Sequence, residues 1–466
     1  MGCMTLRFRD DGTFRILQIS DIQDGPQVSE DTLQLIGDAV RQADPDLVVL
    51  TGDQIRGYDP AYIDTFISRR GDRPGDNVRI VSRLEAALEH VPSQREQCRR
   101  NNLPAPDETE LMNRTRQNVR STFSQFLGPI AAHGVPFAAT YGNHDFQCGI
   151  DVDEQDDLYR EIDGCLNPVA GSGPLALEPG TFALPVLSSA GERIAMGVMM
   201  VNSGDYALDG DASRAVPSTG PVSSGAHPVA QGRGLDLVDC DGYGVPSAAA
   251  IDWLADAEHE LSARNGDGAP VPAIAFQHIP TQEFYDCLRE VPWWTMNAVE
   301  GTRAFSGRCF LLDETVCQPG SVLGESVNCA DINVGEVTAM RHAGGYFALF
   351  AGHDHKNAYV GHAGGLDLGY APTCGFASYG PDADLRGVRL LTFREDNPSA
   401  YHTRMITWGE LGGGAVHDKL RVFLGDYGAA DAATVRNQLR RPKVAGAIGV
   451  AAAGLLSAIA AHRRRQ

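Results

Sequence analysis

Residues 14–53 read FRILQISDIQDGPQVSEDTLQLIGDAVRQADPDLVVLTGD, and this stretch predicts a strand–helix–strand unit. Two runs in it, Phe14–Ser20 and Leu47–Thr51, have the length and the β-branched content of buried strands. Between them, apolar side chains recur every three to four residues from Leu33 to Val40, which is typical of an amphipathic helix. Strands joined through a helix pair in parallel, so the stretch favours an α/β fold.

The same alternation continues along the chain. Further helices are predicted over 113–133, ending at Gly134, and from Ser247 through Leu261. Most of the predicted strands are continuously apolar, which indicates burial on both faces of a sheet. The remaining predicted strands are Pro136–Tyr141, Ile194–Val201, Ala273–Phe276, Tyr346–Ala351 and Val388–Phe393.

Polar clusters stand where five of these strands end. In order along the chain they are Asp21-Ile22-Gln23, Gly52-Asp53, Gly142-Asn143-His144-Asp145, His278 and Gly352-His353-Asp354-His355. Ligands of open α/β sheets bind outside the carboxyl ends of the strands. We therefore expect the five clusters to converge on one crevice.

The residue types in these clusters are those of a site for divalent metals. In an extended segment, residues two apart point to the same side, which would pair Asp21 with Gln23 and His353 with His355. Carboxylate oxygen and imidazole nitrogen together suit manganese, iron, zinc or cobalt. Each cluster alone has a simpler explanation, as a turn, a helix cap or a hydrogen-bonded core histidine. Their joint occurrence in this order favours the metal site.

The order of these motifs resembles that of the calcineurin-like metallophosphoesterase superfamily over about residues 14–393. The stretches LVVLTGDQIRG, TYGNHD, NSGDY, FQHIPTQEFY and GHDHKN are most similar to its branch of purple-acid-phosphatase relatives. The resemblance implies a four-layer α/β/β/α sandwich, with two mixed β-sheets packed face to face and covered by helices.

The resemblance also implies two divalent metal ions, with identity open among manganese, iron and zinc. Asp21 and His355 would hold the first ion, with Gln23 nearby. Asn143, His278 and His353 would hold the second, and Asp53 would bridge both through its two oxygens. His144 would be the general acid that protonates the leaving oxygen, and Asp145 would orient its imidazole.

The implied activity is hydrolysis of a phosphomonoester or a small phosphodiester by in-line attack of a metal-bridging hydroxide. A second hypothesis is a non-catalytic or single-metal scaffold, because the chain departs from the family at position 23. The family expects His there, or Gly combined with a Tyr three residues after the bridging Asp, and this chain has Gln23 and Arg56. Gln23 would either bind the metal through its amide oxygen or hydrogen-bond a water on the metal. Arg56 would either reach the phosphate or lie on the surface as an ordinary Arg.

One phosphoesterase domain is expected over residues 1–410, with insertions at about 55–111 and 204–245, followed by an extension over 411–443. The insertions would be lids or substrate loops, or else surface excursions. Residues 444–461 are apolar and lie between basic residues. They predict a C-terminal helix that either associates with a membrane or packs on the domain.

The composition of the chain indicates which kinds of molecule it binds. The chain has 39 Lys and Arg against 60 Asp and Glu, a net charge of −21, which argues against a grip on nucleic-acid phosphates and favours a small phosphorylated substrate. The ten cysteines form no CxxC pair, and residues 1–9 contain no apolar signal segment. We therefore expect a cytoplasmic protein with reduced thiols; the sequence predicts no oligomeric state.

Overall fold

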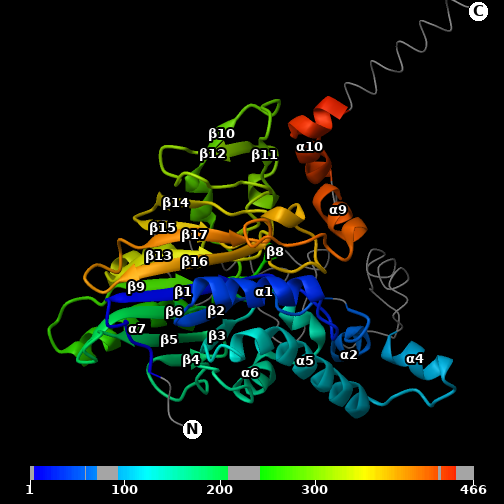
Figure 1. Cartoon of the computed structure of the whole chain (residues 1–466), viewed down its shortest axis with the longest axis horizontal. Coiled ribbons are helices and arrows are strands. Elements are labelled where there is room, and N and C mark those ends of the chain that lie inside the picture. The colour runs from blue at the N-terminus through cyan, green and yellow to red at the C-terminus, as the bar shows by residue number, and fades with distance from the viewer. Residues whose placement is uncertain (1–4, 58, 71–92, 208–241, 429–431, 448–466) are drawn as a thin grey trace, which may run out of the picture.

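A computed structural model gives the fold, and it describes residues 5–57, 59–70, 93–207, 242–428 and 432–447. Two large β-sheets form its centre (Figure 1). The first has five strands in the order β17-β16-β1-β2-β3, in which β1, β2 and β3 are parallel neighbours and β16 runs antiparallel to β1. Its strands are β1 (Thr13–Ile19), β2 (Leu47–Thr51), β3 (Phe137–Thr140), β16 (Gly387–Arg394) and β17 (His402–Thr407).

The second sheet has seven strands in the order β14-β15-β13-β9-β6-β5-β4 and is also mixed. Its centre is parallel, because β9 pairs in parallel with both β6 and β13. The strands are β4 (Ala176–Glu178), β5 (Thr181–Leu187), β6 (Ile194–Met200), β9 (Ala273–Phe276), β13 (Tyr346–Ala351), β14 (Val360–Ala363) and β15 (Leu366–Tyr370).

Helices cover the outer face of each sheet. The helices that cover the sheets are α1 (Glu30–Ala43), α5 (Glu108–Ala131), α6 (Val152–Arg160), α7 (Ala248–Asn265) and α8 (Glu336–Ala343). The other described helices are α2 (Ile63–Arg70), α4 (Gln94–Arg100), α9 (Lys419–Tyr427) and α10 (Ala432–Arg440). Single 3-10 turns are η1 (Asp145–Cys148), η3 (Gln282–Cys287), η4 (Arg303–Phe305) and η5 (Ala383–Leu385).

Three buried apolar clusters account for the layers. One joins α1, α5 and α6 to the outer face of the five-stranded sheet, and a second joins α7 and α8 to the outer face of the seven-stranded sheet. The third lies between the sheets and contains Phe14 and Val49 from one and Phe276 and Phe350 from the other. Since a sheet with apolar side chains on both faces must be covered on both, the chain folds as a four-layer α/β/β/α sandwich, as predicted.

The predicted elements are present, and most boundaries are correct within two residues. Three of the seven predicted strands, β2, β9 and β13, have the predicted bounds, and the other four differ by one residue at one or both ends. The helix predicted over 113–133 begins five residues earlier, at Glu108, because Asp107 accepts a hydrogen bond from the backbone N–H of Glu110 and caps it there. Strands β4, β5, β14, β15 and β17 were not predicted.

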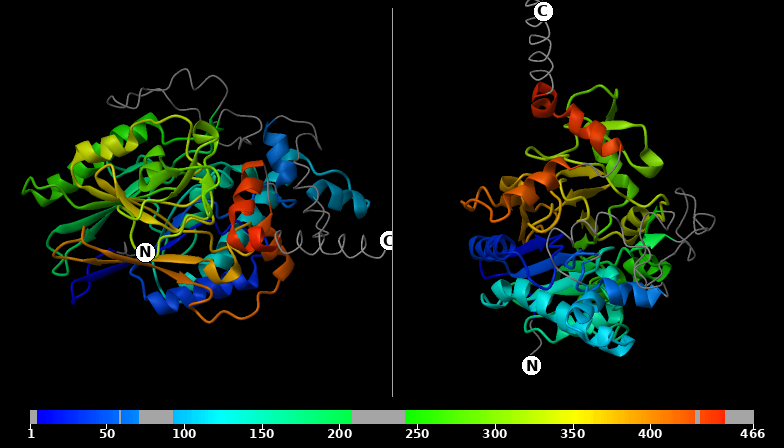
Figure 2. Two further views of the ribbon diagram at one scale, coloured as in Figure 1. Left: turned by 90° about the horizontal axis from the view of Figure 1, so that it is seen from above. Right: turned by 90° about the vertical axis from the view of Figure 1, so that its right-hand side faces the viewer.

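Smaller elements lie outside the sandwich. Strands β10 (Leu288–Val291), β11 (Val299–Glu300) and β12 (Cys309–Leu312) form a separate sheet, and β7 (Tyr206–Ala207) pairs with β8 (Gly242–Tyr243). Figure 2 shows α9 and α10 at the same end of the molecule as the small sheet. The described part of the first insertion contains α2 and α4. Most of the second insertion, and the predicted helix beyond residue 447, lie outside the described residues. Among described residues, none forms a helix long and apolar enough to cross a membrane.

Candidate metal centre

Loops that follow five strands meet where the two sheets face each other. The loops after β1, β2 and β3 carry the clusters that begin at Asp21, Gly52 and Gly142, and the loops after β9 and β13 carry His278 and the cluster that begins at Gly352. The first three strands are parallel neighbours in one sheet, and the other two are parallel neighbours in the second. The predicted convergence of five loops is therefore present in the structure.

Two groups of three buried side chains offer metal-ligand atoms, and they share one residue. Asp21, Asp53 and His355 form the first group, and Asp53, His278 and His353 form the second. Within each group the ligand atoms lie within 4.8 Å of one another. A carboxylate common to two such groups is the arrangement expected of a two-metal site.

Asp21 and His355 face each other across the first group. One oxygen of Asp21, Oδ2, accepts hydrogen bonds from Ser20 Oγ at 2.5 Å and from the His353 backbone N–H at 2.9 Å. The other oxygen, Oδ1, lies 3.2 Å from His355 Nε2. His355 Nδ1 lies 2.6 Å from the carbonyl oxygen of Tyr379, whose ring stacks on the imidazole at 4.0 Å. Because the carbonyl can only accept, Nδ1 donates, and Nε2 is free to face a metal.

Asp53 lies between the two groups. Its Oδ1 accepts the backbone N–H of His144 at 2.8 Å. Its Oδ2 lies 2.7 Å from Gln23 Nε2 and 3.2 Å from His278 Nε2. One oxygen of Asp53 therefore faces both groups, whereas the sequence had suggested that each oxygen serves one ion.

His278 and His353 are held in fixed orientations. His278 Nδ1 donates to the carbonyl oxygen of Thr51 at 2.9 Å, which leaves Nε2 toward Asp53. His353 Nδ1 lies 3.1 Å from His278 Nε2, and the ring of Tyr243 packs edge-on against the His353 imidazole at 4.4 Å. Both imidazoles thus direct a nitrogen to the same small volume.

Asn143 is oriented by a residue that sequence reasoning did not single out. Its Nδ2 donates to the hydroxyl of Tyr206 at 2.8 Å, so its Oδ1 is the atom left for a metal. Tyr206 lies in β7 and stacks on Tyr243 of β8 at 5.7 Å. The stretch NSGDY, which ends at Tyr206, was the available sequence signal. Both tyrosines lie in the described ends of the second insertion, so these ends contact the site.

The predicted partner of His144 differs in the structure. Its Nδ1 lies 2.6 Å from Oε1 of Gln147, three residues further along, and its Nε2 lies 3.9 Å from Asp53 Oδ2. The side chain is 29% exposed, enough to meet a substrate, while the ligands around it are buried. Gln147, rather than Asp145, therefore orients the imidazole; its spacing in the 3-10 turn η1 allows this contact.

Asp145 has a structural role, and not the expected one of orienting the His144 imidazole. Its two oxygens accept four backbone N–H groups, those of Asp53, Gln54, Ile55 and Gly142, at 2.8–3.0 Å. These donors belong to the loops after β2 and β3. A carboxylate that accepts four N–H bonds has no capacity left for a histidine, so Asp145 ties two ligand loops together.

Four site residues have left-handed backbone conformations. The φ values are +53° at Asp21, +40° at Gln23, +53° at Asp53 and +74° at His353. Such conformations cost about 1 kcal/mol or more for residues with a Cβ, and they occur mainly at functional sites. The argument that residues two apart share one side does not hold here, because these residues are not extended.

Two motif glycines are required by close packing. A Cβ on Gly142 would lie 2.2 Å from Asp53 Oδ1 and 2.6 Å from His278 Nε2. A Cβ on Gly352 would lie 1.9 Å from Ser20 Oγ. Any side chain at either position would push the ligands apart, which explains the glycine that precedes Asn143 and His353.

The two departures from the family pattern have clear positions. Gln23 is buried, and its Nε2 contacts Asp53 Oδ2 beside the first group. Rotating the amide by half a turn would put Oε1 where Nε2 now lies. The guanidinium of Arg56 pairs with the buried carboxylate of Asp59 at 2.6 Å, and its side chain is 14% exposed. Arg56 is therefore not an ordinary surface residue, and its guanidinium is engaged by Asp59.

Burial and neighbouring charges shift the pKa values of four residues in the metal-free site. Burial alone would lower the pKa of His278, but the carboxylates of Asp53 and Asp21 outweigh it and raise the pKa to about 9. Burial, together with the charge of His278, lowers the pKa of His353 well below its usual range. Burial opposes ionisation of Asp53, yet the neighbouring histidines lower its pKa. The pKa of Asp145 rises to about 7, because burial and the charge of Asp53 exceed the effect of its N–H donors.

Three atoms in the site test whether it suits metal ions. Asp21 Oδ1, Asn143 Oδ1 and His353 Nε2 are buried and lack a hydrogen-bond partner in the part of the chain that the structure describes. Buried polar atoms without partners cost about 1–3 kcal/mol each, so they need a ligand. Carboxylate, amide and imidazole atoms of this kind suit manganese, iron or zinc, and the site therefore fits two divalent ions.

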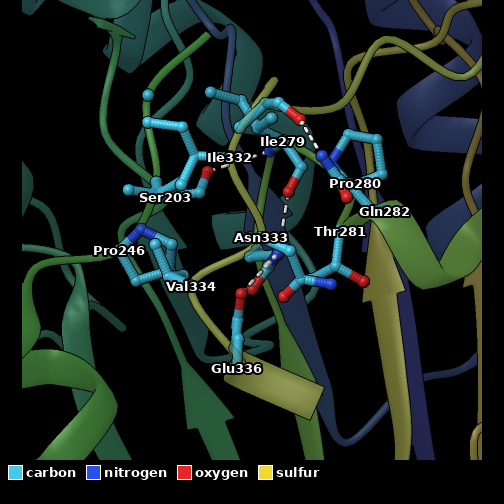
Figure 3. Close-up of a pocket in the computed structure, with 14 residues that line it drawn as sticks. Ser203, Pro246, Ile279, Pro280, Thr281, Gln282, Ile332, Asn333, Val334 and Glu336 are labelled. Carbon is cyan, nitrogen blue, oxygen red and sulfur yellow. Dashed lines mark hydrogen bonds between the residues drawn. The ribbon is translucent and has the colours of Figure 1, made fainter. Parts of the chain in front are cut away.

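A small cavity lies beside the segment that carries His278. Figure 3 shows Ser203, Ile279 and Glu336 on its wall, with the backbone N–H of Ile279 donating to Ser203 Oγ at 2.9 Å. Its volume of about 20 Å³ admits roughly one water molecule. Burial raises the pKa of Glu336 to about 8, so the cavity has a proton-binding carboxyl in contact with Gln277, the neighbour of His278.

Comparisons with known proteins find one family model and several similar chains. A family model described as calcineurin-like phosphoesterase matches residues 14–186, which include the strands that carry Asp21, Asp53 and Asn143. A protein of Arabidopsis thaliana named probable inactive purple acid phosphatase 28 is 23% identical over 410 residues, which are 83% of this chain and 77% of that protein. A crystal structure of a dimetal phosphatase from Danio rerio shares 12% identity with a TM-score of 0.38, over 85% of this chain and 99% of that one. A structure from Thermus thermophilus shares 7% identity with a TM-score of 0.32, over 84% and 99% of the two chains.

Proposed function

We propose that the chain is a binuclear metal-dependent enzyme that hydrolyses a phosphomonoester or a small phosphodiester, because the model of the calcineurin-like phosphoesterase family matches residues 14–186. The observation that carries the proposal is Asp53, which is common to two buried groups of metal-ligand atoms. The other members of these groups come from both sheets: Asp21 follows β1 of the five-stranded sheet, and the three histidines follow β9 and β13 of the seven-stranded sheet.

The proposed ligand sets follow from the contacts. Asp21, Asp53 and His355 would hold the first ion, and Gln23 would complete that site through its amide oxygen. Asn143 Oδ1, Asp53, His278 and His353 would hold the second ion. When bound, the two ions would supply the Lewis acidity that activates water as a nucleophile and neutralises charge on the phosphate.

The residues of the chain supply the remaining chemistry. His144 is partly exposed beside Asp53, and we assign it the role of general acid, which donates a proton from Nε2 to the leaving oxygen. Gln147 holds Nδ1 and keeps the ring turned this way. Asp145 keeps the loops after β2 and β3 in register, so that Asp53 and Asn143 stay in one site.

A second candidate is a metal-binding protein without catalytic activity. Two observations favour it: position 23 holds a neutral amide in place of an imidazole, and the relative from Arabidopsis thaliana is named probable inactive. A neutral amide is a weaker ligand than imidazole, which would reduce occupancy of the first site. The retained His144 and its partner Gln147 favour the enzyme.

Metal titration of stripped protein separates the two candidates. Hydrolysis of a chromogenic monoester and diester is followed while manganese, iron or zinc is added and bound metal is counted. We expect turnover that rises with the second equivalent and is lost in His144→Ala at unchanged metal content. A fully loaded protein that hydrolyses neither ester with any of these metals would support the non-catalytic candidate.

A further inference from the structure

Exposed apolar side chains gather at one end of the molecule. Of thirteen large hydrophobic side chains that are exposed among the described residues, eight come from the loop between β10 and β11 and from helices α9 and α10. We call these eight the apolar end: Trp293, Trp294, Met296, Leu420, Phe423, Leu424, Val435 and Leu439. The two adjacent tryptophans are 67% and 66% exposed, which is unusual for so large a side chain.

The two helices present apolar side chains to solvent at helical spacing. On α9, Leu420, Phe423 and Leu424 are exposed at positions i, i+3 and i+4, and on α10, Val435 and Leu439 are exposed at i and i+4. A surface helix normally turns such a stripe toward the core. Here the stripe faces outward, so it requires a partner beyond the described chain.

Hydrogen bonds join the loop and both helices into one unit. Arg440 Nε donates to the carbonyl oxygen of Trp293 at 2.6 Å, and the backbone N–H of Asn297 donates to the carbonyl oxygen of Arg440 at 3.1 Å. Gln438 Nε2 donates to the carbonyl oxygen of Asp426 in α9 at 2.7 Å. Figure 1 shows α10 beside the small sheet and α9 next to α10. The loop and the two helices are thus one assembled unit.

The C-terminal stretch, residues 432–466, is basic, whereas the rest of the protein is acidic. The whole chain has a net charge of −21, yet residues 432–466 contain seven Arg and Lys and no Asp or Glu. Arg436 and Arg440 pair with Glu300, and Arg441 pairs with Asp426. The other four, Lys443 and Arg463–Arg465, stand on either side of the apolar run 444–461 in the sequence. Apolar residues flanked by basic ones are the composition that binds anionic lipid surfaces.

We propose that the apolar end docks on the surface of an anionic lipid bilayer. Trp293 and Trp294 would lie at the level of the lipid headgroups, where an indole can bury its ring and keep its N–H in a polar layer. The leucines and the phenylalanine of α9 would enter the adjacent acyl region. Lys443 and Arg463–Arg465, which are not among the arginines that pair with Glu300 and Asp426, would supply positive charge for the lipid phosphates.

Two other occupants would suit an apolar surface, and both are outcomes of the test. A second copy of the chain would bury the apolar end in a dimer, and the run 444–461 would bury it by folding back. The basic excess of the C-terminal stretch favours the bilayer over the second copy. A two-fold contact at this end would bring the basic stretches of the two copies together, and they would repel each other.

Tryptophan fluorescence tests contact with lipid directly. The chain has four tryptophans, and the other two, Trp253 and Trp408, are 5% and 2% exposed, so any lipid quencher acts on Trp293 and Trp294. The full-length protein is mixed with vesicles of phosphatidylcholine, with and without phosphatidylglycerol, that carry brominated acyl chains. We expect quenching with the anionic vesicles that weakens as salt is raised. Fluorescence that no vesicle quenches would overturn the proposal.

A double variant tests whether the apolar end contributes to affinity. Trp293→Ser with Trp294→Ser should lower co-sedimentation with anionic vesicles about tenfold or more, since two large apolar side chains are lost. Leu103→Ser with Val169→Ser, which are 55% and 59% exposed and lie outside this surface, is the matched control and should bind like wild type. Equal binding of both variants, or a dimer in solution that only the tryptophan variant disrupts, would overturn the proposal.

Discussion

Replacing Gln147 by methionine should weaken general-acid catalysis without emptying the metal site. The substitution removes the acceptor 2.6 Å from His144 Nδ1 while keeping the volume of the side chain. A single hydrogen bond of this kind contributes about 0.5–1.5 kcal/mol net. Since about 1.4 kcal/mol changes a rate tenfold, kcat should fall about two- to tenfold. Metal content should stay unchanged, because Gln147 is in neither group of ligand atoms.

The leaving group of the substrate provides the specific readout. A nitrophenyl ester needs little help from an acid, whereas an alkyl ester needs its leaving oxygen protonated. Gln147→Met should therefore slow the alkyl ester more than the nitrophenyl ester. An equal loss on both esters, or no loss, would refute the assigned contact. Gln147→Glu is the control: it keeps an acceptor, and its carboxylate favours the charged imidazolium, so activity should persist and the alkaline limb of the pH profile should move to higher pH.

Three further outcomes are expected. Asp145→Asn places an amide N–H₂ against backbone donors and leaves N–H groups of the ligand loops unpaired, so the free energy of unfolding should fall by about 2–4 kcal/mol in chemical denaturation, and an unchanged midpoint would contradict the tying role. Tyr206→Phe removes the acceptor that orients Asn143, so affinity for one metal equivalent should fall about tenfold by titration calorimetry while the other is retained. In metal-free protein, the pKa of His278 is raised to about 9 from 6.5, so its stabilising effect is complete below about pH 6.5 and is lost as the pH rises to 9. Melting temperatures in chelator should decline over that window, and bound metal, which replaces the proton, should remove the decline.

Local patterns in the sequence could predict an α/β fold with strands buried on both faces and the location of the site, whereas the four-layer sandwich was implied by the family resemblance. Continuous apolar runs such as Leu47–Thr51 have no other stable environment than a sheet covered on both faces, and the structure buries all five residues. Parallel strands end at a common edge of the sheet, so the polar residues that follow them are expected to lie close together. His278 could be placed this way although it lies more than 200 residues from Asp53.

The finer contacts of the site could not be predicted, because they depend on distances across the fold. Proximity in the motif suggested Asp145 as the partner of His144. In the structure, however, the Asp145 carboxylate accepts hydrogen bonds from backbone N–H groups of another loop. Tyr206 reaches Asn143 over 63 positions, and no local pattern indicates such a pair. The left-handed backbone at Asp53 and His353 is likewise a result of tertiary packing around the site.

The central claim is that Asp53 joins two metal sites, and a metal count on Asp53→Asn tests it most directly. Wild-type protein that is stripped and reloaded should bind about two divalent ions per chain, and its esterase activity should follow the second. Asp53→Asn should stay folded by circular dichroism, and both ions should bind at least about tenfold more weakly, because each group loses its shared carboxylate. If the variant loses one ion and keeps the other at full affinity, or retains both, Asp53 does not bridge two metals and the account is wrong.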